Sequence, residues 1–318
     1  MKWCLSGWLV AGLLCLAWPV LSAPAPRQPV VVSTDIGDDI DDAFALGLLL
    51  RSPEFDVRGI ASAWGDTALR TRLLQHLLVQ AGRTDIVLAI GEPTHGEIPF
   101  SQTRWAERGT LPADAPSAAE LILREARRQP GQVTLLVLGP LTDAAAALRR
   151  DPTGFARLGR IVLMGGSVRA GYGKSDYRAP SPPAAEYNIA ADVAAAQAVF
   201  ASGVPITMLP LDATQVKLEE SARVSLFAHG DALTDALAQL YYQWRDTDQP
   251  WASATPTLFD VVPVAQLLAP SLCPTQPLHI EVDAQGFTRE GPGRPNVQAC
   301  LTLDKPGLVE LLMRRLLR

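Results

Sequence analysis

Residues 30–45 read VVVSTDIGDDIDDAFA, an apolar β-branched run followed at once by five aspartates within eight positions. The pattern predicts a buried strand that delivers carboxylates to one point, with a helix beginning behind them. Carboxylates at this density repel one another unless some are solvated and others bind a cation. A hard divalent metal, Ca²⁺ or Mg²⁺, is the natural counter-charge. The alternative is a solvated acidic turn, which the apolar flanks disfavour.

The first 23 residues predict an export signal. Lys2 precedes an apolar stretch that ends in small residues at Ser22-Ala23, and residues 24–28 form a short Pro-rich lead-in. A membrane anchor is the competing interpretation, but the apolar run is short and Pro19 interrupts it. A lipid attached at Cys15 is a further alternative, although the small residue expected before it is missing. We expect an exported protein, periplasmic or secreted, without a stable membrane anchor after cleavage.

The cysteines and the net charge indicate the redox state and the class of ligand to expect. Removal of the signal leaves Cys273 and Cys300, which form either one disulfide or two separate buried thiols. The formal net charge of −5 and the lack of a basic stripe argue against a nucleic-acid polymer as partner. A small molecule is the expected ligand.

Strand-like and helix-like segments alternate through most of the chain. This alternation predicts an α/β fold with a doubly wound, mostly parallel open sheet, covered by helices on both faces and forming a single domain over residues 29–318. Four further segments follow: a helical pattern over 219–247, a short helix at 258–269, a hairpin or two strands within 276–302 and a helix at 305–317. The predicted strands are 29–34, 57–63, 86–90, 133–138, 160–164 and 205–209, and the predicted helices between them are 41–51, 67–81, 117–129, 141–150 and 191–202.

Polar or small residues stand where these strands end. In open α/β sheets ligands bind at the carboxyl ends of the strands. The predicted ends carry Asp35, Trp64-Gly65-Asp66, residues 138–143 and Met164-Gly165-Gly166. Two long loops, about 91–116 and 165–187, are expected to contribute to the same crevice.

Several short motifs occur together and in order. They are Asp35-x-Gly37 with Asp41-Asp42-Ala43, Gly139-Pro140-Leu141-Thr142, Met164-Gly165-Gly166, Glu186-Tyr187-Asn188 and the late Leu258-Phe259-Asp260. On these motifs the chain resembles the inosine-uridine preferring nucleoside hydrolase family from about residue 29 to 270. The resemblance implies a Rossmann-like fold and hydrolysis of the N-glycosidic bond of ribonucleosides to free base and ribose.

The resemblance also implies a Ca²⁺ site and a catalytic base. Its ligands would be Asp35, Asp42, Asp260 and the backbone carbonyl of Leu138, with Asp35 also taking the proton of the metal-bound water. Asp41, Glu186 and Asn188 would contact the ribose. Helix capping is the alternative role for Glu186 and Asn188. A homodimer or homotetramer is implied as well. The full predicted substrate-binding set is Asp41, Trp64, Asp66, Met164, Glu186, Tyr187, Asn188 and Phe259.

The chain also departs from the family pattern. Ser33 replaces an Asp, and two extra residues before Asp41 allow Asp38 or Asp39 to join the metal site. Asp66 and Pro180 stand where Asn is common, which bears on ribose recognition.

Phe259 replaces a His that protonates the leaving base in several members. Stacking of the base on Phe259 with Trp64, Trp105 or Trp251 would compensate and favour purines. His95, on the first long loop, is the alternative acid.

Two other functions compete with this one. A nucleoside- or sugar-binding protein could keep the fold and metal after losing turnover, although a base at Asp35 argues for chemistry. An aspartate-based phosphotransferase is disfavoured because Ser33 supplies no second carboxylate. An EF-hand is excluded because position twelve from Asp35 is Leu46.

Overall fold

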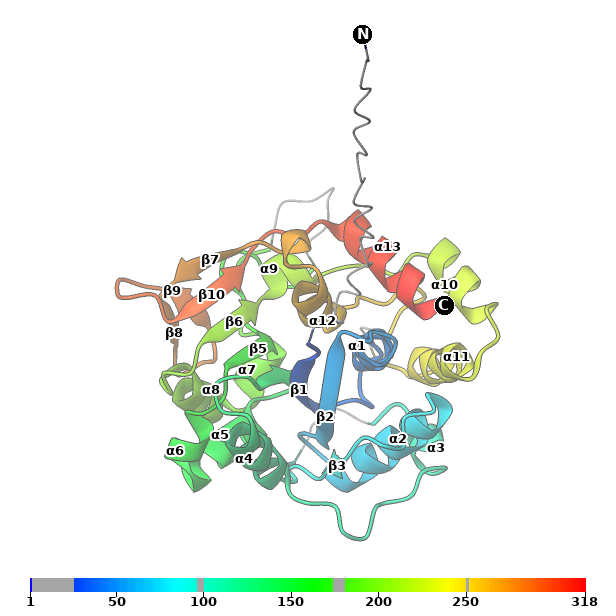
Figure 1. Cartoon of the computed structure of the whole chain (residues 1–318), viewed down its shortest axis with the longest axis horizontal. Helices are drawn as coiled ribbons and strands as arrows, with labels where there is room; N and C mark the ends of the chain where they lie inside the picture. The colour runs from blue at the N-terminus through cyan, green and yellow to red at the C-terminus, as the bar shows by residue number, and fades with distance from the viewer. Residues whose placement is uncertain (2–25, 96–99, 174–180, 250–251) are drawn as a thin grey trace.

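The protein is built on one eight-stranded sheet (Figure 1) with the order β3-β2-β1-β4-β5-β6-β10-β7. The computed structural model describes Met1 and residues 26–95, 100–173, 181–249 and 252–318. The pairings are parallel from β3 through β10, and only β7 runs antiparallel. The sheet strands are β1 (Gln28–Thr34), β2 (Phe55–Ser62), β3 (Leu88–Ala89), β4 (Thr134–Val137), β5 (Arg160–Met164), β6 (Ile206–Leu209), β7 (Thr275–Leu278) and β10 (Val297–Cys300).

Strand β1 is central because both of its faces are covered. Val30, Val31 and Val32 are completely buried. Val30 and Val32 belong to one apolar cluster, and Val31 belongs to a second cluster on the other side of the sheet. A strand buried on both faces reads as a continuous apolar run, which is the pattern of the quoted stretch.

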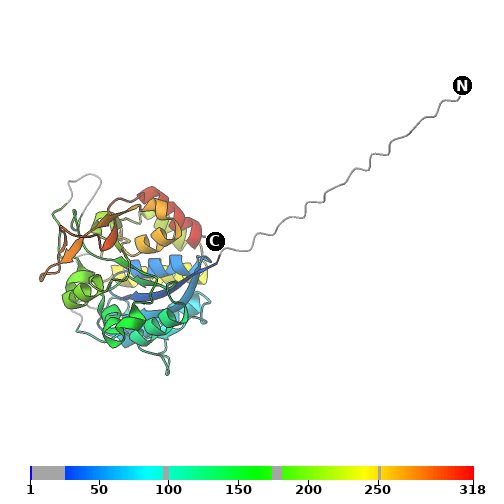
Figure 2. The ribbon, with the colours of Figure 1, turned by 60° about the vertical axis from the view of Figure 1, so that its left-hand side comes forward.

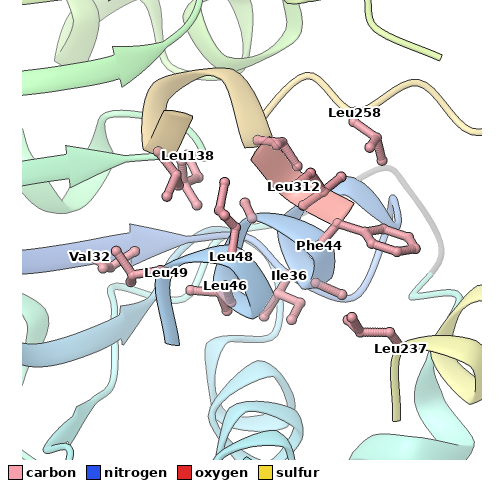
Figure 3. Close-up of a cluster of buried hydrophobic side chains, with 14 of the residues drawn as sticks. Val32, Ile36, Phe44, Leu46, Leu48, Leu49, Leu138, Leu237, Leu258 and Leu312 are labelled. Carbon is pink, nitrogen blue, oxygen red and sulfur yellow. The ribbon is translucent and has the colours of Figure 1, made fainter. Parts of the chain in front are cut away.

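Helices cover both faces of the sheet (Figure 2). One face carries α1, α2, α11, α12 and α13, whose buried apolar side chains form one cluster with Val32 and Leu138. Figure 3 shows part of this cluster, including Leu237 of α11 and Leu312 of α13. The other carries α4, α5 and α8. Within the described ranges, no helix is both long and apolar enough to cross a membrane. The helices of these layers are α1 (Asp41–Leu50), α2 (Thr67–Gln80), α4 (Ala118–Arg128), α5 (Thr142–Arg150), α8 (Val193–Phe200), α11 (Ala232–Arg245), α12 (Val261–Leu268) and α13 (Lys305–Leu316).

The predicted single-domain α/β fold is confirmed, with differences in its second half. The helical pattern over 219–247 divides into α10 (Glu220–Phe227) and α11, because Gly230 adopts φ +78° between them. The helix predicted at 191–202 corresponds to α8, which begins after its N-cap Asp192, and a separate short helix, α7 (Tyr187–Ala191), precedes it. Shorter helices or turns are α3 (Thr103–Ala106), α6 (Pro152–Phe155), α9 (Leu211–Thr214) and the 3₁₀ turn η1 (Pro270–Leu272).

The segment 276–302 contributes more to the sheet than predicted. It holds β10, which pairs in parallel with β6, and most of β7, which pairs with β10. A separate hairpin is formed by β8 (Ile280–Val282) and β9 (Thr288–Glu290). Short strands in a loop-rich segment give no clear periodicity, so their partners could not be assigned from sequence.

A disulfide joins Cys273, after η1, to Cys300 at the end of β10, across 27 positions. It ties the end of the α12–η1 segment to β10, the strand next to the edge strand β7. This resolves the alternative left by the sequence in favour of one disulfide, the form that oxidising compartments maintain. The predicted signal, residues 1–23, lies outside the described residues apart from Met1.

The disulfide is expected to stabilise the fold measurably. Closing a loop of this size restricts the unfolded chain by roughly 3–4 kcal/mol. Reduction should therefore lower the thermal midpoint by about 5–10 °C. The variant C273S/C300S should start at the lower midpoint and should not respond to reductant. Equal midpoints for reduced and oxidised wild type would contradict this expectation.

Candidate functional site

A cavity of about 500 Å³ lies at the carboxyl edge of the sheet. This is the edge at which open α/β sheets bind ligands, and the volume suits a small molecule. The cavity gathers residues from the ends of β1, β4 and β5 and from the segments leading into α7 and α12. Its lining consists of Asp35, Asp38, Asp39, Asp41, Asp42, Leu138, Met164, Tyr172, Glu186, Tyr187, Asn188, Phe259 and Asp260.

Three carboxylates form the tightest acidic group. Oxygens of Asp41, Asp42 and Asp260 lie within 4.8 Å of one another, and all three residues are buried. Asp41 and Asp42 occupy the first turn of α1, where the helix dipole favours negative charge. Asp260 precedes α12, which packs against α1, and its backbone N–H donates to Asp41 Oδ2 at 3.3 Å. The Thr34 hydroxyl donates to Asp42 Oδ1.

The electrostatics of this group call for a cation. Burial, followed by the charges of neighbouring aspartates, raises the pKa of Asp41 and of Asp260 well above the usual range. Burial likewise raises the pKa of Asp42 to about 6, although its hydrogen bond with Thr34 opposes the shift. Three converging buried carboxylates with few donors between them are a suitable donor set for a hard divalent ion.

Asp35 stands beside this group at the end of β1. Burial, followed by the charge of Asp42, raises the pKa of Asp35 well above its usual range. Gly139 leaves room for its carboxyl, because a Cβ at position 139 would lie 2.6 Å from Asp35 Oδ1. The tight group therefore contains Asp41, the predicted ribose contact, whereas Asp35 faces the cavity next to it. The difference arises because Asp41 and Asp42 share the first turn of α1, whereas Asp35 directly follows β1.

The other predicted metal donor, the Leu138 carbonyl, is held by Asn188. Asn188 Nδ2 donates to Leu138 O at 2.7 Å and to Met164 O at 3.2 Å. One amide thus links the ends of β4 and β5 at the cavity floor. A carbonyl oxygen has a second lone pair, so this bond leaves Leu138 O able to accept another partner.

Glu186 is both a helix cap and a cavity residue. Its carboxylate accepts from the backbone N–H groups of Gly166 at 2.8 Å, Asn188 at 3.0 Å and Ile189 at 3.2 Å. Burial nevertheless raises its pKa to about 7, because desolvation outweighs these bonds. Glu186 therefore caps α7 and lines the cavity at the same time, and its orientation is fixed by the start of α7.

Comparison with known proteins fits this geometry. The model of the inosine-uridine preferring nucleoside hydrolase family matches residues 30–310. The pyrimidine-specific ribonucleoside hydrolase RihA of Citrobacter koseri is 32% identical over 91% of this chain and 97% of its own length. RihA of Escherichia coli is also 32% identical, over 91% and 98%. The chain belongs to the inosine-uridine preferring nucleoside hydrolase family.

Solved structures agree. A plant nucleoside hydrolase superimposes with a TM-score of 0.78 at 27% identity, covering 92% of this chain and 99% of the plant chain. A purine-preferring ribonucleoside hydrolase from Gardnerella vaginalis has the same fold, with a TM-score of 0.77 at 23% identity over 91% and 98% of the two chains. This nucleoside hydrolase is accordingly a hydrolase of N-glycosyl compounds that acts on small-molecule nucleosides.

Three predicted site residues of the nucleoside hydrolase do not line the cavity. Asp66 is exposed and caps α2 by accepting from the Leu69 N–H at 2.9 Å. Trp64 is half-buried, with φ +62°. His95 is exposed, at the end of a described stretch.

The aromatic wall of the cavity differs from the predicted one. Trp105 is 1% exposed and packs on His76, with ring centroids 4.3 Å apart, so it belongs to the core. Phe259 instead meets Tyr172 edge to face, with centroids 6.3 Å apart. The Tyr172 hydroxyl accepts from the Tyr187 N–H at 2.9 Å. Trp251 and Pro180 lie outside the described residues.

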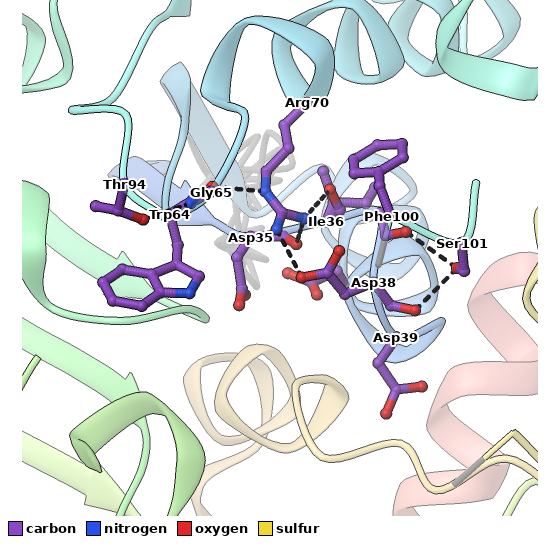
Figure 4. Close-up of polar contacts among 12 residues, drawn as sticks. Asp35, Ile36, Asp38, Asp39, Trp64, Gly65, Arg70, Thr94, Phe100 and Ser101 are labelled. Atoms are coloured by element: carbon purple, nitrogen blue, oxygen red, sulfur yellow. Dashed lines mark hydrogen bonds and ion pairs between the residues drawn. The ribbon is translucent and has the colours of Figure 1, made fainter. Parts of the chain in front are cut away.

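Arg70 is a site residue that the sequence reasoning missed. It is 2% exposed and pairs with Asp38, with 2.6 Å between Nη2 and Oδ2 (Figure 4). The available signal was the position of Arg70 on the same stripe of α2 as Leu73, Leu74 and Leu77. A charged residue on a buried stripe requires a buried partner.

Gly139→Ala should disable the enzyme without unfolding it. Its added methyl group would displace the Asp35 carboxyl, and nucleoside hydrolysis should fall by about tenfold or more. Circular dichroism should show an unchanged fold. Gly291→Ala is the control, because its added methyl group would have the flexible Glu281 side chain as its nearest contact, at 3.3 Å, and it should keep full activity. Wild-type turnover by Gly139→Ala would show that the position of Asp35 is unimportant.

Proposed function

We propose that this protein hydrolyses ribonucleosides to free base and ribose, with Ca²⁺ as cofactor and Asp35 as general base. The observation that carries the proposal is the position of Asp35 in the cavity, beside the buried group Asp41, Asp42 and Asp260. A binding protein would have no need of a carboxylate placed to act as a base on water. The names of the curated relatives support a ribonucleoside as substrate.

The cation would be held by Asp35, Asp42, Asp260 and the Leu138 carbonyl, with Asp41 adjacent. All of these donors are oxygens, which Ca²⁺ prefers, and flexible coordination by six to eight oxygens suits so crowded a set. When bound, Ca²⁺ offsets the buried negative charge, orients the sugar hydroxyls and makes water more acidic.

The protein groups then have separate tasks. Asp35 accepts the proton of the water that attacks the anomeric carbon. Cleavage passes through an oxocarbenium-like state, so carboxylate and amide oxygens around the sugar stabilise its positive charge. Asp41, Glu186 and Asn188 supply those oxygens at the cavity wall, and Met164 and Tyr187 complete the sugar side.

The base would rest against the aromatic wall of Phe259 and Tyr172. Stacking of the planar base on these aromatic rings contributes to binding, and it favours purines because their ring system is larger. Proton delivery to the leaving base would come from solvent, with His95 as the alternative donor. The curated relatives are named pyrimidine-specific, so the preference of this chain requires direct measurement.

We also propose that the enzyme works outside the cytoplasm. The disulfide between Cys273 and Cys300 supports this location, since such bonds persist in oxidising compartments. The signal predicted at residues 1–23 is consistent with it.

Metal and base can be tested together. Chelator-treated protein should lose hydrolysis of inosine and uridine, and added Ca²⁺ should restore it. Asp35→Asn should lower kcat by about 100-fold or more, because general-base catalysis contributes that much. Asp66→Asn is the matched control, since it makes the same change at an exposed cap, and should stay near wild type. Undiminished turnover by Asp35→Asn would refute the base assignment.

A nucleoside panel tests the handling of the base. We expect a higher kcat/KM for inosine and adenosine than for uridine and cytidine, and Phe259→Ala should reduce this ratio several-fold by removing about 1 kcal/mol of stacking. His95→Ala should leave kcat unchanged. A tenfold loss there would assign proton delivery to His95. A ratio below one would reverse the preference while leaving nucleoside hydrolysis intact.

A further inference from the structure

We propose that Arg70 is a positioning residue that removes Asp38 from the metal-binding set and holds the turn at residues 35–38 in its active shape. The inference rests on the proposed Ca²⁺-dependent hydrolysis and deepens it. It assigns a duty to one of the two extra aspartates between Asp35 and Asp41.

Arg70 reaches the turn from α2 and bonds to it at several points (Figure 4). Its Nη1 donates to the carbonyls of Asp35 and Ile36, the latter at 2.9 Å. Its Nε donates to the Trp64 carbonyl at 2.7 Å, which ties the turn to the end of β2. Because the guanidinium is planar and rigid, these bonds fix the backbone that directly follows the Asp35 side chain.

A second set of hydrogen bonds to this turn comes from residues 101–102. The Ser101 hydroxyl donates to the carbonyls of Gly37 at 3.0 Å and Asp38 at 2.8 Å, and Gln102 Nε2 donates to the Asp39 carbonyl at 3.0 Å. Phe100 covers Gly37, where a Cβ would lie 2.1 Å from the ring. The carbonyls of residues 35–39 thus all accept hydrogen bonds from Arg70 or from residues 101–102.

The charge of Asp38 is likewise separated from the charges of the three clustered carboxylates. Asp38 Oδ2 is bound by Arg70 in a pair whose side chains are 2% and 9% exposed, whereas Asp38 Oδ1 is buried without a hydrogen-bond partner among the described residues. Asp38 lies outside the tight group of Asp41, Asp42 and Asp260. A carboxylate that is paired with a buried guanidinium is a poor metal ligand, because breaking the pair would leave the guanidinium buried without a counter-charge.

Calcium titration tests whether Asp38 is a ligand. Wild type, Asp38→Asn and Asp42→Asn would be stripped of metal and titrated with Ca²⁺ by calorimetry. Asp38→Asn should bind within threefold of wild type, while Asp42→Asn should lose at least 30-fold. A loss of tenfold or more for Asp38→Asn would make Asp38 a ligand and overturn the proposal.

Kinetics test the positioning role. Arg70→Met should lower kcat at saturating Ca²⁺ by at least tenfold. Arg70→Lys keeps the charge but not the planar guanidinium, and its kcat should lie between those of wild type and Arg70→Met. Adding Asp38→Asn to Arg70→Met should recover at least threefold, because the stranded carboxylate is gone. The control is Arg223→Met, a buried arginine of α10 that donates to the Leu218 carbonyl, and it should keep its kcat. A kcat for Arg70→Met within twofold of wild type would refute the role.

Unfolding separates this proposal from the proposed function. Urea midpoints of metal-free wild type, Asp38→Asn, Arg70→Met and the double variant require neither metal nor substrate. Arg70→Met should have the lowest midpoint, and the double variant should exceed it. Additive effects would show that the pair is uncoupled and overturn the proposal even if no nucleoside is cleaved. If Arg70→Met fails to fold while the double variant folds, the stranded Asp38 charge is the cause, as proposed.

Discussion

The rest of the structure depends on the concentration of negative charge at the end of β1. Two like charges 4 Å apart repel by about 4 kcal/mol at an effective dielectric constant of 20. Five aspartates between positions 35 and 42 therefore cannot all ionise in a buried site without compensation. The fold provides one fixed compensation, Arg70 against Asp38, and a partial one, the N-terminal turn of α1 against Asp41 and Asp42. The remainder is the charge that the proposed cation would neutralise.

The sheet makes this concentration tolerable because it is rigid. Val30, Val31 and Val32 anchor β1 in both apolar clusters, and β2 and β4 flank it in parallel. The strand end consequently cannot relax away from its neighbours. Packing of α1 on α12 brings Asp260 to the same point from more than 200 residues along the chain. Rigid elements of this kind hold reacting groups more precisely than loops do.

Sequence patterns could predict the architecture because it follows from local periodicity. The central strand, the alternation and the cavity residues at strand ends can be predicted from the sequence. Asp35, Leu138 and Met164 lie where the strand-end rule puts them. The pairing of β10 with β6 could not be predicted, since short strands carry no partner information. Burial of Trp105 against His76 was equally hidden, because an aromatic residue on a long loop packs either inward or toward a ligand.

Asp38 and Asp39 show how two further acids fit into the turn before α1 without disrupting the site. Asp38 turns toward Arg70, whereas Asp39 points away from it, and its Oδ1 accepts from the Ile40 N–H at 2.7 Å (Figure 4). Burial, together with the charges of Asp42 and Asp38, raises the pKa of Asp39 to about 7. A further buried acid is tolerated where a buried guanidinium neutralises it, or where its pKa is high enough for the carboxyl to be protonated near neutral pH. The first condition holds for Asp38 and the second for Asp39, so Asp41 and Asp42 remain free to face Asp260.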